Sequence, residues 1–236
     1  MLIDFFAHHW LLVIISIVCS YLVSSVNTSI IVTGIVRHED IRKLGSGNAG
    51  FTNVLRCVGK VPAVITFVGD FLKGVLSIMI PYLLTWGWDS ADAQSERGIL
   101  MYIAGLFAIL GHMFPLYYKF KGGKGVVTTA SVMLMTDWRA LVLTLLIFLI
   151  VFIITKTISK GSLTAAVFYP FITAGLRFAD TAGILSVTAP TKEPTPMFIA
   201  CVFAITLLSS LAVIIKHKEN IKRILNGTEK KITAKK

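Results

Sequence analysis

Long segments without charged residues constrain this chain more than any other feature of its sequence. Residues 5–36 contain no Asp, Glu, Lys or Arg, and about 20 mostly apolar residues suffice for one helix across a bilayer. Hydrophobic residues make up 55% of the 236-residue chain and charged residues 15%, against about 25% charged in ordinary globular proteins. A soluble protein of this composition would need a core larger than its polar residues can cover. The sequence therefore predicts an all-α, polytopic helical membrane protein.

Seven transmembrane helices fit the apolar segments. We expect residues 125–155, which are apolar except for Asp137 and Arg139, to form a helical hairpin. Its first half is short, and a short span is expected to tilt or to insert only in part. Residues 161–176 predict a slightly extended span. The other predicted spans lie in residues 5–36, 57–86, 98–118 and 194–215.

The distribution of positive charge predicts the orientation. The chain holds 23 Lys and Arg residues and has a formal net charge of +11. With seven spans and the N-terminus outside, 18 of these 23 lie in cytoplasmic segments, as the positive-inside rule requires. A six-span arrangement would export the C-terminal tail with its eight positive residues, and we reject it. In the five-span alternative, 125–155 is one helix and 161–176 does not cross. In the favoured seven-span arrangement, we expect residues 1–216 to form the membrane-integral helical catalytic domain and residues 217–236 to form a cytoplasmic basic C-terminal segment that contributes to the site.

Four polar clusters fall in the predicted cytoplasmic segments. Residues 45–56 contain three glycines, whose backbone N–H groups can converge on an anion, and an arginine, whose planar fork suits phosphate. Residues 111–115 contain His112 and Pro115, which should end or kink the third span, and residues 120–125 contain two lysines among three glycines. The clusters at 155–162 and 217–229 add hydroxyl, amide and cationic groups. We expect all four to converge on one cytoplasmic site for a ligand with a phosphate head and a fatty tail.

The candidate residues follow from these clusters. The three widely spaced cysteines, Cys19, Cys57 and Cys201, fit no metal site, so no metal is predicted. Asp70 and Lys73 lie three apart inside the second span, where charges are costly; we interpret them as a structural pair, with lining of the site as the alternative. The candidate binding residues are Ser46, Gly47, Asn48, Gly50, Thr52, Asn53, Arg56, Lys121, Gly122, Gly123, Lys124, Ser159 and Ser162, and the candidate catalytic residues are His112, His217 and Asn220.

The clusters resemble the signatures of the bacterial acyl-phosphate-dependent glycerol-3-phosphate acyltransferases, a membrane-integral family. The resemblance runs from about residue 10 to 230, although Lys156 and Thr157 stand where the third signature usually has Arg and Tyr. The matching residues are Ser46, Gly47, Asn48, Gly50, Thr52, Asn53 and Arg56; Asp70, Lys73 and Gly74; Gly111, His112, Phe114, Pro115 and 120–126; Ser159, Gly161 and Ser162; His217, Asn220, Ile221, Arg223 and 227–229.

The resemblance implies a bacterial inner-membrane enzyme with its active site at the cytoplasmic face. It would transfer an acyl group from acyl-phosphate to the first hydroxyl of glycerol 3-phosphate. The products would be 1-acyl-glycerol 3-phosphate (lysophosphatidic acid) and phosphate, in the first step of phospholipid synthesis. No cofactor, CoA or metal would be required. We expect a monomer in membrane lipid, and no nucleic-acid partner because the basic residues sit between apolar segments.

An acyl phosphate already carries a good leaving group, so the enzyme must chiefly align it and stabilise developing negative charge. His112 or His217 is a candidate general base. We favour the donor's own phosphate as the proton acceptor, because neither histidine has an evident acidic partner in sequence.

Three other functions remain as alternatives to acyl transfer. They are an organic-phosphate anion transporter, a lipid phosphatase and a regulatory subunit of lipid synthesis. Transporters tend to contain repeated halves, and no internal repeat is evident.

Overall fold

The computed structural model describes residues 2–88, 90–182 and 195–231. These residues form α-helices and short 3₁₀ turns, and they contain no β-strand. The all-α prediction is therefore confirmed for the described part of the chain. The chain divides into two compact units, Met1–Met135 and Thr136–Lys236, which are described separately below.

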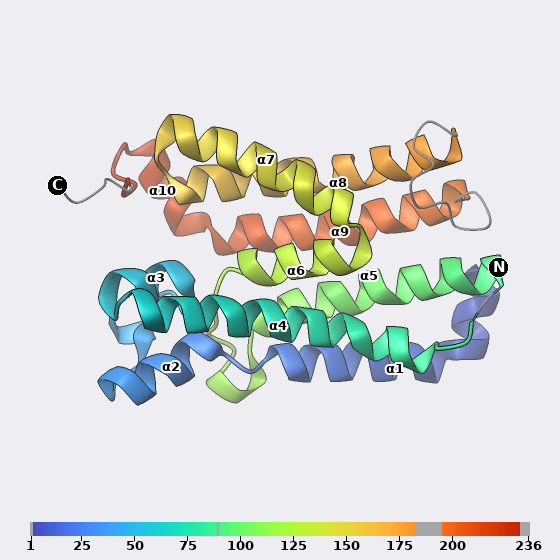
Figure 1. Ribbon diagram of the computed structural model, residues 1–236, viewed down its shortest axis with the longest axis horizontal. Helices are drawn as coiled ribbons and strands as arrows, with labels where there is room; N and C mark the ends of the chain where they lie inside the picture. Colours follow the sequence, from blue (N-terminus) through green and yellow to red (C-terminus); the bar gives the residue numbers. More distant parts are fainter. Residues whose placement is uncertain (1, 89, 183–194, 232–236) are drawn as a thin grey trace. The chain divides into compact units, whose positions relative to one another are not determined.

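The first unit is built on three long helices that pack side by side (Figure 1). Small residues let them approach closely: a Cβ at Gly111 of α5 would lie 2.5 Å from the carbonyl oxygen of Tyr21 in α1. Asn27 separates α1 from α2, because its side chain accepts a hydrogen bond from Ile30 N at 3.1 Å and caps the second helix. The elements are α1 (Leu2–Ser24), α2 (Thr28–Arg37), η1 (Ile41–Lys43), α3 (Phe51–Cys57), α4 (Lys60–Leu84), α5 (Ala91–Met113), η2 (Leu116–Tyr118) and α6 (Val126–Thr136).

The second unit consists of α7 (Trp138–Thr155), α8 (Ile158–Thr181), α9 (Pro196–Lys216) and the short α10 (Lys218–Leu225). Helix α8 packs against both α7 and α9 (Figure 1). A Cβ at Gly161 would lie 2.9 Å from Phe148 O, so glycine permits the close contact between α8 and α7.

Within the part of the chain that the structure describes, six helical segments are long and apolar enough to cross a membrane. They are Phe5–Arg37, Lys60–Leu84, Ala93–Tyr118, Trp138–Thr155, Ile158–Thr181 and Pro196–Lys216. The candidate seventh crossing, α6, has 11 residues and covers about 16 Å, about half of the hydrocarbon thickness. The protein is thus an integral membrane protein, and the count of seven stays a prediction.

The five-span alternative rests on two assumptions that differ from the structure. Residues 125–155 are not one helix, because Asp137 interrupts them and its side chain accepts a hydrogen bond from Arg139 N to cap α7. The segment 161–176 lies inside α8, whose 24 residues are long enough to cross. We therefore set the five-span arrangement aside.

Four charged side chains, of which Asp137 and Arg139 are buried and Arg177 and Asp180 half-buried, join α7 to α8 at the end where α7 begins. The Arg139 guanidinium donates to Asp180 at 2.7 and 2.8 Å and to Asp137 at 2.9 and 3.0 Å. Arg177 lies 3.3 Å from Asp137. Two positive and two negative groups balance each other, which is how charges tolerate burial.

Candidate functional site

The first glycine-rich cluster forms a tight loop between η1 and α3. Gly45 and Gly47 adopt positive φ angles of 57° and 70°, which glycine accepts at little steric cost. Asn53 holds the loop from inside, since its Oδ1 accepts from Ser46 N at 3.0 Å and its Nδ2 donates to Leu44 O at 2.9 Å. The exposed residues of this loop are Gly45, Ser46 and Gly47, and Arg56 is exposed on α3.

Asn53, one of the predicted binding residues, lies inside the loop. Its side chain is buried, and its amide nitrogen donates to two backbone carbonyls, those of Ile41 and Leu44. Because both amide hydrogens are used, Asn53 builds the loop, and its direct contact with a ligand stays a prediction. Of the other members of this set, Asn48 and Thr52 are half-buried and Gly50 is buried.

In the second cluster, α5 ends at Met113, two residues before Pro115, as predicted. The following turn requires positive φ angles of 56° and 57° at Lys119 and Phe120. Gly122 N and Gly123 N then donate back to the carbonyls of Met113 and His112, each at 3.2 Å. This backbone turn leaves the Lys121 side chain exposed and the Lys124 side chain half-buried.

Gly123 is the point at which the first two clusters meet. A Cβ at this position would lie 2.6 Å from Ala49 O in the first loop and 2.1 Å from the His112 Nε2. Real Cβ atoms essentially never come this close, so only glycine fits. The structure therefore brings the glycine-rich loop, the lysine-rich loop and His112 together.

Asp70 is the acidic partner of His112 that sequence reasoning missed. Its Oδ1 lies 3.6 Å from His112 Nδ1 and 2.9 Å from Lys73 Nζ, which confirms the predicted Asp70–Lys73 pair. Lys73 also donates to Val26 O at 2.7 Å. All three side chains are buried. Asp70 and His112 are 42 positions apart, and only the packing of α4 on α5 joins them.

The third and fourth clusters meet within the second unit. Asn220 of α10 donates from Nδ2 to Ser159 Oγ at 2.7 Å and to Glu229 Oε1 at 2.7 Å. Ser159 donates to the same Oε1 at 2.6 Å, and Arg223 Nε donates to Oε2 at 2.7 Å. Sequence reasoning gave Glu229 no role, yet this carboxylate links the start of α8 to α10.

The charge state of Glu229 follows from these contacts. Burial by itself would raise the pKa of this carboxyl, but the hydrogen bonds from Ser159, Arg223 and Asn220 outweigh burial and lower the pKa from its usual value. Glu229 is therefore an anion at neutral pH, and it accepts all three donors.

Two more candidates lie beside this network. Ser162 is one turn beyond Ser159 on α8; its hydroxyl is buried and makes no hydrogen bond within the described residues. His217 is buried at the junction of α9 and α10, with Nδ1 2.8 Å from Val213 O. Because a carbonyl only accepts, Nδ1 carries the proton. Among the described residues, no group of three His, Cys, Asp or Glu could hold a metal ion.

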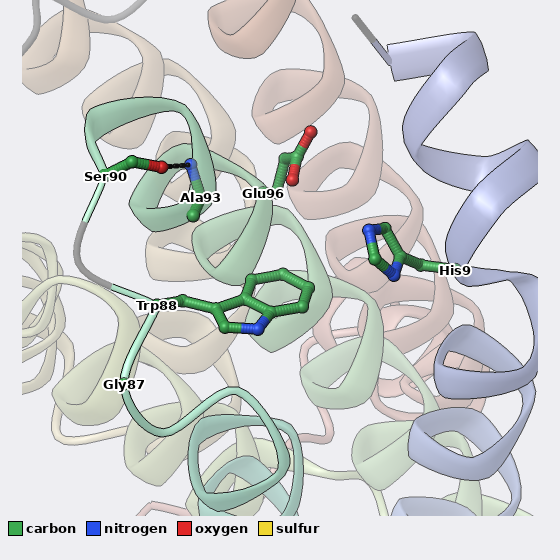
Figure 2. Close-up of a pocket in the computed structure, with 6 residues that line it drawn as sticks. All are labelled: His9, Gly87, Trp88, Ser90, Ala93 and Glu96. Atoms are coloured by element: carbon green, nitrogen blue, oxygen red, sulfur yellow. Dashed lines mark hydrogen bonds between the residues drawn. The ribbon is translucent and has the colours of Figure 1, made fainter.

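A separate pocket of about 550 Å³ lies at the opposite end of the first unit. Figure 2 shows His9 of α1 facing Trp88 and Glu96 across it, beside the Ser90 cap of α5. Ala93 in its wall and His112 are 19 residues apart on α5, or about 28 Å along the helix. None of the predicted site residues lines this pocket.

Comparison with known proteins identifies the family. The family model described as glycerol-3-phosphate acyltransferase matches residues 14–227, which is most of the chain. The chain belongs to the glycerol-3-phosphate acyltransferase family. The resemblance seen in the four clusters is thereby confirmed.

Relatives and solved structures of the glycerol-3-phosphate acyltransferase family match over nearly their whole length. A glycerol-3-phosphate acyltransferase of Prochlorococcus marinus is 36% identical over 93% of this chain and 97% of its own. That of Clostridioides difficile is 36% identical over 94% and 97%. The crystal structure of PlsY, an integral membrane glycerol 3-phosphate acyltransferase in its glycerol 3-phosphate form, superposes with a TM-score of 0.71 at 29% identity. It covers 94% of this chain and 96% of that chain.

Proposed function

We propose that this protein transfers an acyl group from an acyl phosphate to the 1-hydroxyl of glycerol 3-phosphate. The products are 1-acyl-glycerol 3-phosphate and inorganic phosphate, in the first acylation of phospholipid synthesis. The observation that supports this best is the junction at Gly123, where two glycine-rich loops pack together in a membrane protein of the glycerol-3-phosphate acyltransferase family. A related solved structure is described as the lysophosphatidic acid form, which agrees with this product.

The first unit supplies groups suited to phosphate. Backbone amides at the glycine-rich turns and the exposed side chains of Ser46, Arg56 and Lys121 present donors and positive charge at one end of this unit. Lys124 adds a second ammonium from the same loop. Such donors bind phosphate and stabilise charge that develops on a leaving group.

The second unit supplies a hydroxyl and an amide held in fixed positions. Ser159 and Asn220 are oriented by Glu229, at 2.6 and 2.7 Å, and Ser162 presents a buried hydroxyl one turn away. We propose that this network acts in the same reaction as the loops of the first unit. The convergence of all four clusters on one site stays a prediction.

At the acyl carbon, the reaction forms one bond and breaks one. The 1-hydroxyl oxygen attacks the acyl carbon, the bond from that carbon to the phosphate oxygen breaks, and the hydroxyl proton passes to the departing phosphate. No metal, cofactor or covalent acyl-enzyme is required for this balance. An acyl phosphate is already activated, so alignment and charge stabilisation supply most of the acceleration.

The surroundings of His112 support the donor phosphate as proton acceptor, although not for the reason taken from the sequence. The imidazole does have an acidic partner, Asp70. However, the imidazole is buried and its Nε2 lies against Gly123, where a Cβ would be only 2.1 Å away, which disfavours the approach of a substrate hydroxyl. We therefore assign His112 to support of the loop. His217, with its proton on Nδ1, is the remaining candidate base at Nε2.

The proposed topology has seven crossings with the N-terminus outside and the C-terminus in the cytoplasm of a bacterial inner membrane. In each unit, three long segments run in alternating directions and the basic loops lie at one end of that unit. If the basic ends of both units face the cytoplasm, α6 must return the chain across the bilayer. We propose that α6 makes this crossing in a thinned or protein-lined region, and that the active enzyme is a monomer.

The choice of donor tests the proposed function directly. Purified protein is supplied with glycerol 3-phosphate and either palmitoyl phosphate, palmitoyl-CoA or a palmitoyl acyl carrier protein. We expect 1-acyl-glycerol 3-phosphate from palmitoyl phosphate alone, with strong loss in Arg56→Ala and Lys124→Ala and full activity in the exposed control Lys60→Ala. Glycerol-phosphate flux without acylation in vesicles would instead indicate a transporter, and release of phosphate without acceptor a phosphatase.

A further inference from the structure

The guanidinium of Arg42 in η1 is held by the Asp40 carboxylate on one side and donates to the lysine-rich loop on the other. Its Nε lies 3.0 Å from both Asp40 carboxylate oxygens, and one terminal nitrogen lies 2.6 Å from Asp40 Oδ2. Asp40 also caps η1 by accepting from Arg42 N at 2.9 Å. The hydrogen bond from Arg42 holds the pKa of the Asp40 carboxyl below its usual value, so the pair is ionised.

The other terminal nitrogen of Arg42 donates to the second cluster. It lies 2.8 Å from Tyr118 O and 3.3 Å from Lys121 O. These two carbonyls flank Lys119 and Phe120, the consecutive non-glycine residues with positive φ. Such backbone is unfavourable for side-chain-bearing residues and persists only where its surroundings hold it.

The backbone of Arg42 also reaches the first cluster. A Cβ at Gly47 would lie 3.3 Å from Arg42 O, which is tighter than most real contacts. One residue therefore borders the glycine-rich loop through its carbonyl and holds the lysine-rich loop through its guanidinium. Because Asp40 neutralises that guanidinium, Arg42 differs from Arg56, whose exposed side chain suits direct phosphate binding.

We propose that Arg42, oriented by Asp40, is a positioning residue for acyl transfer: it fixes the turn from Tyr118 to Lys121 and so sets the place of Lys121 and Lys124. The inference rests on the proposed function, in which this loop grips one substrate phosphate. Asp40 and Arg42 touch no substrate in this proposal. They act through the geometry of the loop.

The first measurement is hydrogen exchange, which needs no substrate. The amides of Phe120, Gly122 and Gly123 are hydrogen-bonded to Pro115, Met113 and His112, so peptides covering residues 116–125 should be protected. We expect protection to fall at least about tenfold in Arg42→Gln and Asp40→Asn, since local exchange follows local opening. Lys43→Gln is the matched control, because it removes the same charge from the exposed neighbouring residue. It should leave protection unchanged.

The second measurement is kinetic. The variant Lys124→Ala identifies the substrate that the loop holds, because the KM of that substrate should rise in this variant. In Arg42→Gln the KM of that same substrate should rise about tenfold or more, as expected when a binding group is misplaced by about an ångström, while kcat changes less than threefold. Arg42→Lys keeps the charge but loses the fork that joins Asp40 to two carbonyls, so it should resemble Arg42→Gln and not the wild type.

The outcomes separate this inference from the proposed function. Unchanged exchange in Arg42→Gln, or wild-type KM in Arg42→Lys, would overturn the positioning role even if acyl transfer is confirmed. Altered exchange in a protein that transfers no acyl group would leave the role of Arg42 in fixing the turn from Tyr118 to Lys121 intact and would refute the proposed function. If Arg42→Gln does not fold, Arg42→Lys and Asp40→Asn supply both measurements.

Discussion

The contact at Gly123 yields the sharpest prediction, for the substitution Gly123→Ala. The new Cβ would lie 2.6 Å from Ala49 O, whereas ordinary contact begins at 3.4 Å. The two loops would have to separate by about 0.8 Å, the difference between these distances. The His112 ring offers no relief, because its Nε2 would be 2.1 Å from the same atom and Asp70 lies on its other side.

The size of the effect follows from that displacement. Overpacking of this kind costs about 1–3 kcal/mol of stability, and a misplacement of about 1 Å at a reacting site lowers turnover about 100-fold. We therefore expect kcat/KM to fall about 100-fold in a protein that still folds. Gly34→Ala is the matched control, since a Cβ there meets nothing within 4 Å, and its activity should equal that of the wild type.

The assay is acyl transfer from palmitoyl phosphate to glycerol 3-phosphate in detergent micelles, with thermal unfolding of each variant measured in parallel. A Gly123→Ala protein with wild-type kcat/KM would refute the argument that the two loops must touch. Complete unfolding of Gly123→Ala would refute the expected stability cost of about 1–3 kcal/mol. Either result would also weaken the assignment of His112 to support of the loop.

Three further predictions concern the second unit. Arg139→Ala leaves the carboxylates of Asp137 and Asp180 with too little compensating positive charge and should lower the free energy of unfolding by about 3–5 kcal/mol. The control Lys222→Ala, at an exposed position, should change the free energy of unfolding by less than about 0.5 kcal/mol. Thermal unfolding in detergent distinguishes the two variants. The pKa of Glu229 is lowered from 4.5, so its stabilising contribution is complete above pH 4.5 and lost as the pH falls through the lowered value. Unfolding measured from pH 7 to pH 3 should show this loss in the wild type, and Glu229→Gln should be less stable at pH 7 and lack the step; identical pH profiles would contradict the role given to this carboxylate. The crossing by α8 can be tested by thiol labelling in a variant that lacks Cys19, Cys57 and Cys201. A cysteine in place of exposed Lys156 should react with a thiol reagent from the cytoplasmic side, and one in place of exposed Ala182 should react from the opposite side. Labelling of both positions from one side would exclude a crossing by α8.

Local sequence determined the helical architecture and the family. Apolar segments of 20 or more residues can satisfy their backbone groups in a bilayer only as helices or closed barrels, and the observed helices lie close to the predicted segments. Pro115 ends α5 because it cannot continue the helix, and Asp137 divides 125–155 because it caps α7. The signature residues are contiguous motifs, so sequence comparison recovers them without knowledge of the packing.

Tertiary packing decided what the polar residues do. No spacing rule joins Asp70 to His112, Arg42 to Tyr118 or Ser159 to Glu229, because tertiary packing brings each pair together across a long sequence separation. Asn53 looks like a phosphate donor in the sequence, and only its buried hydrogen bonds show that it holds the loop. Residue type states which hydrogen bonds a side chain is able to make. The fold alone decides which partner lies within reach.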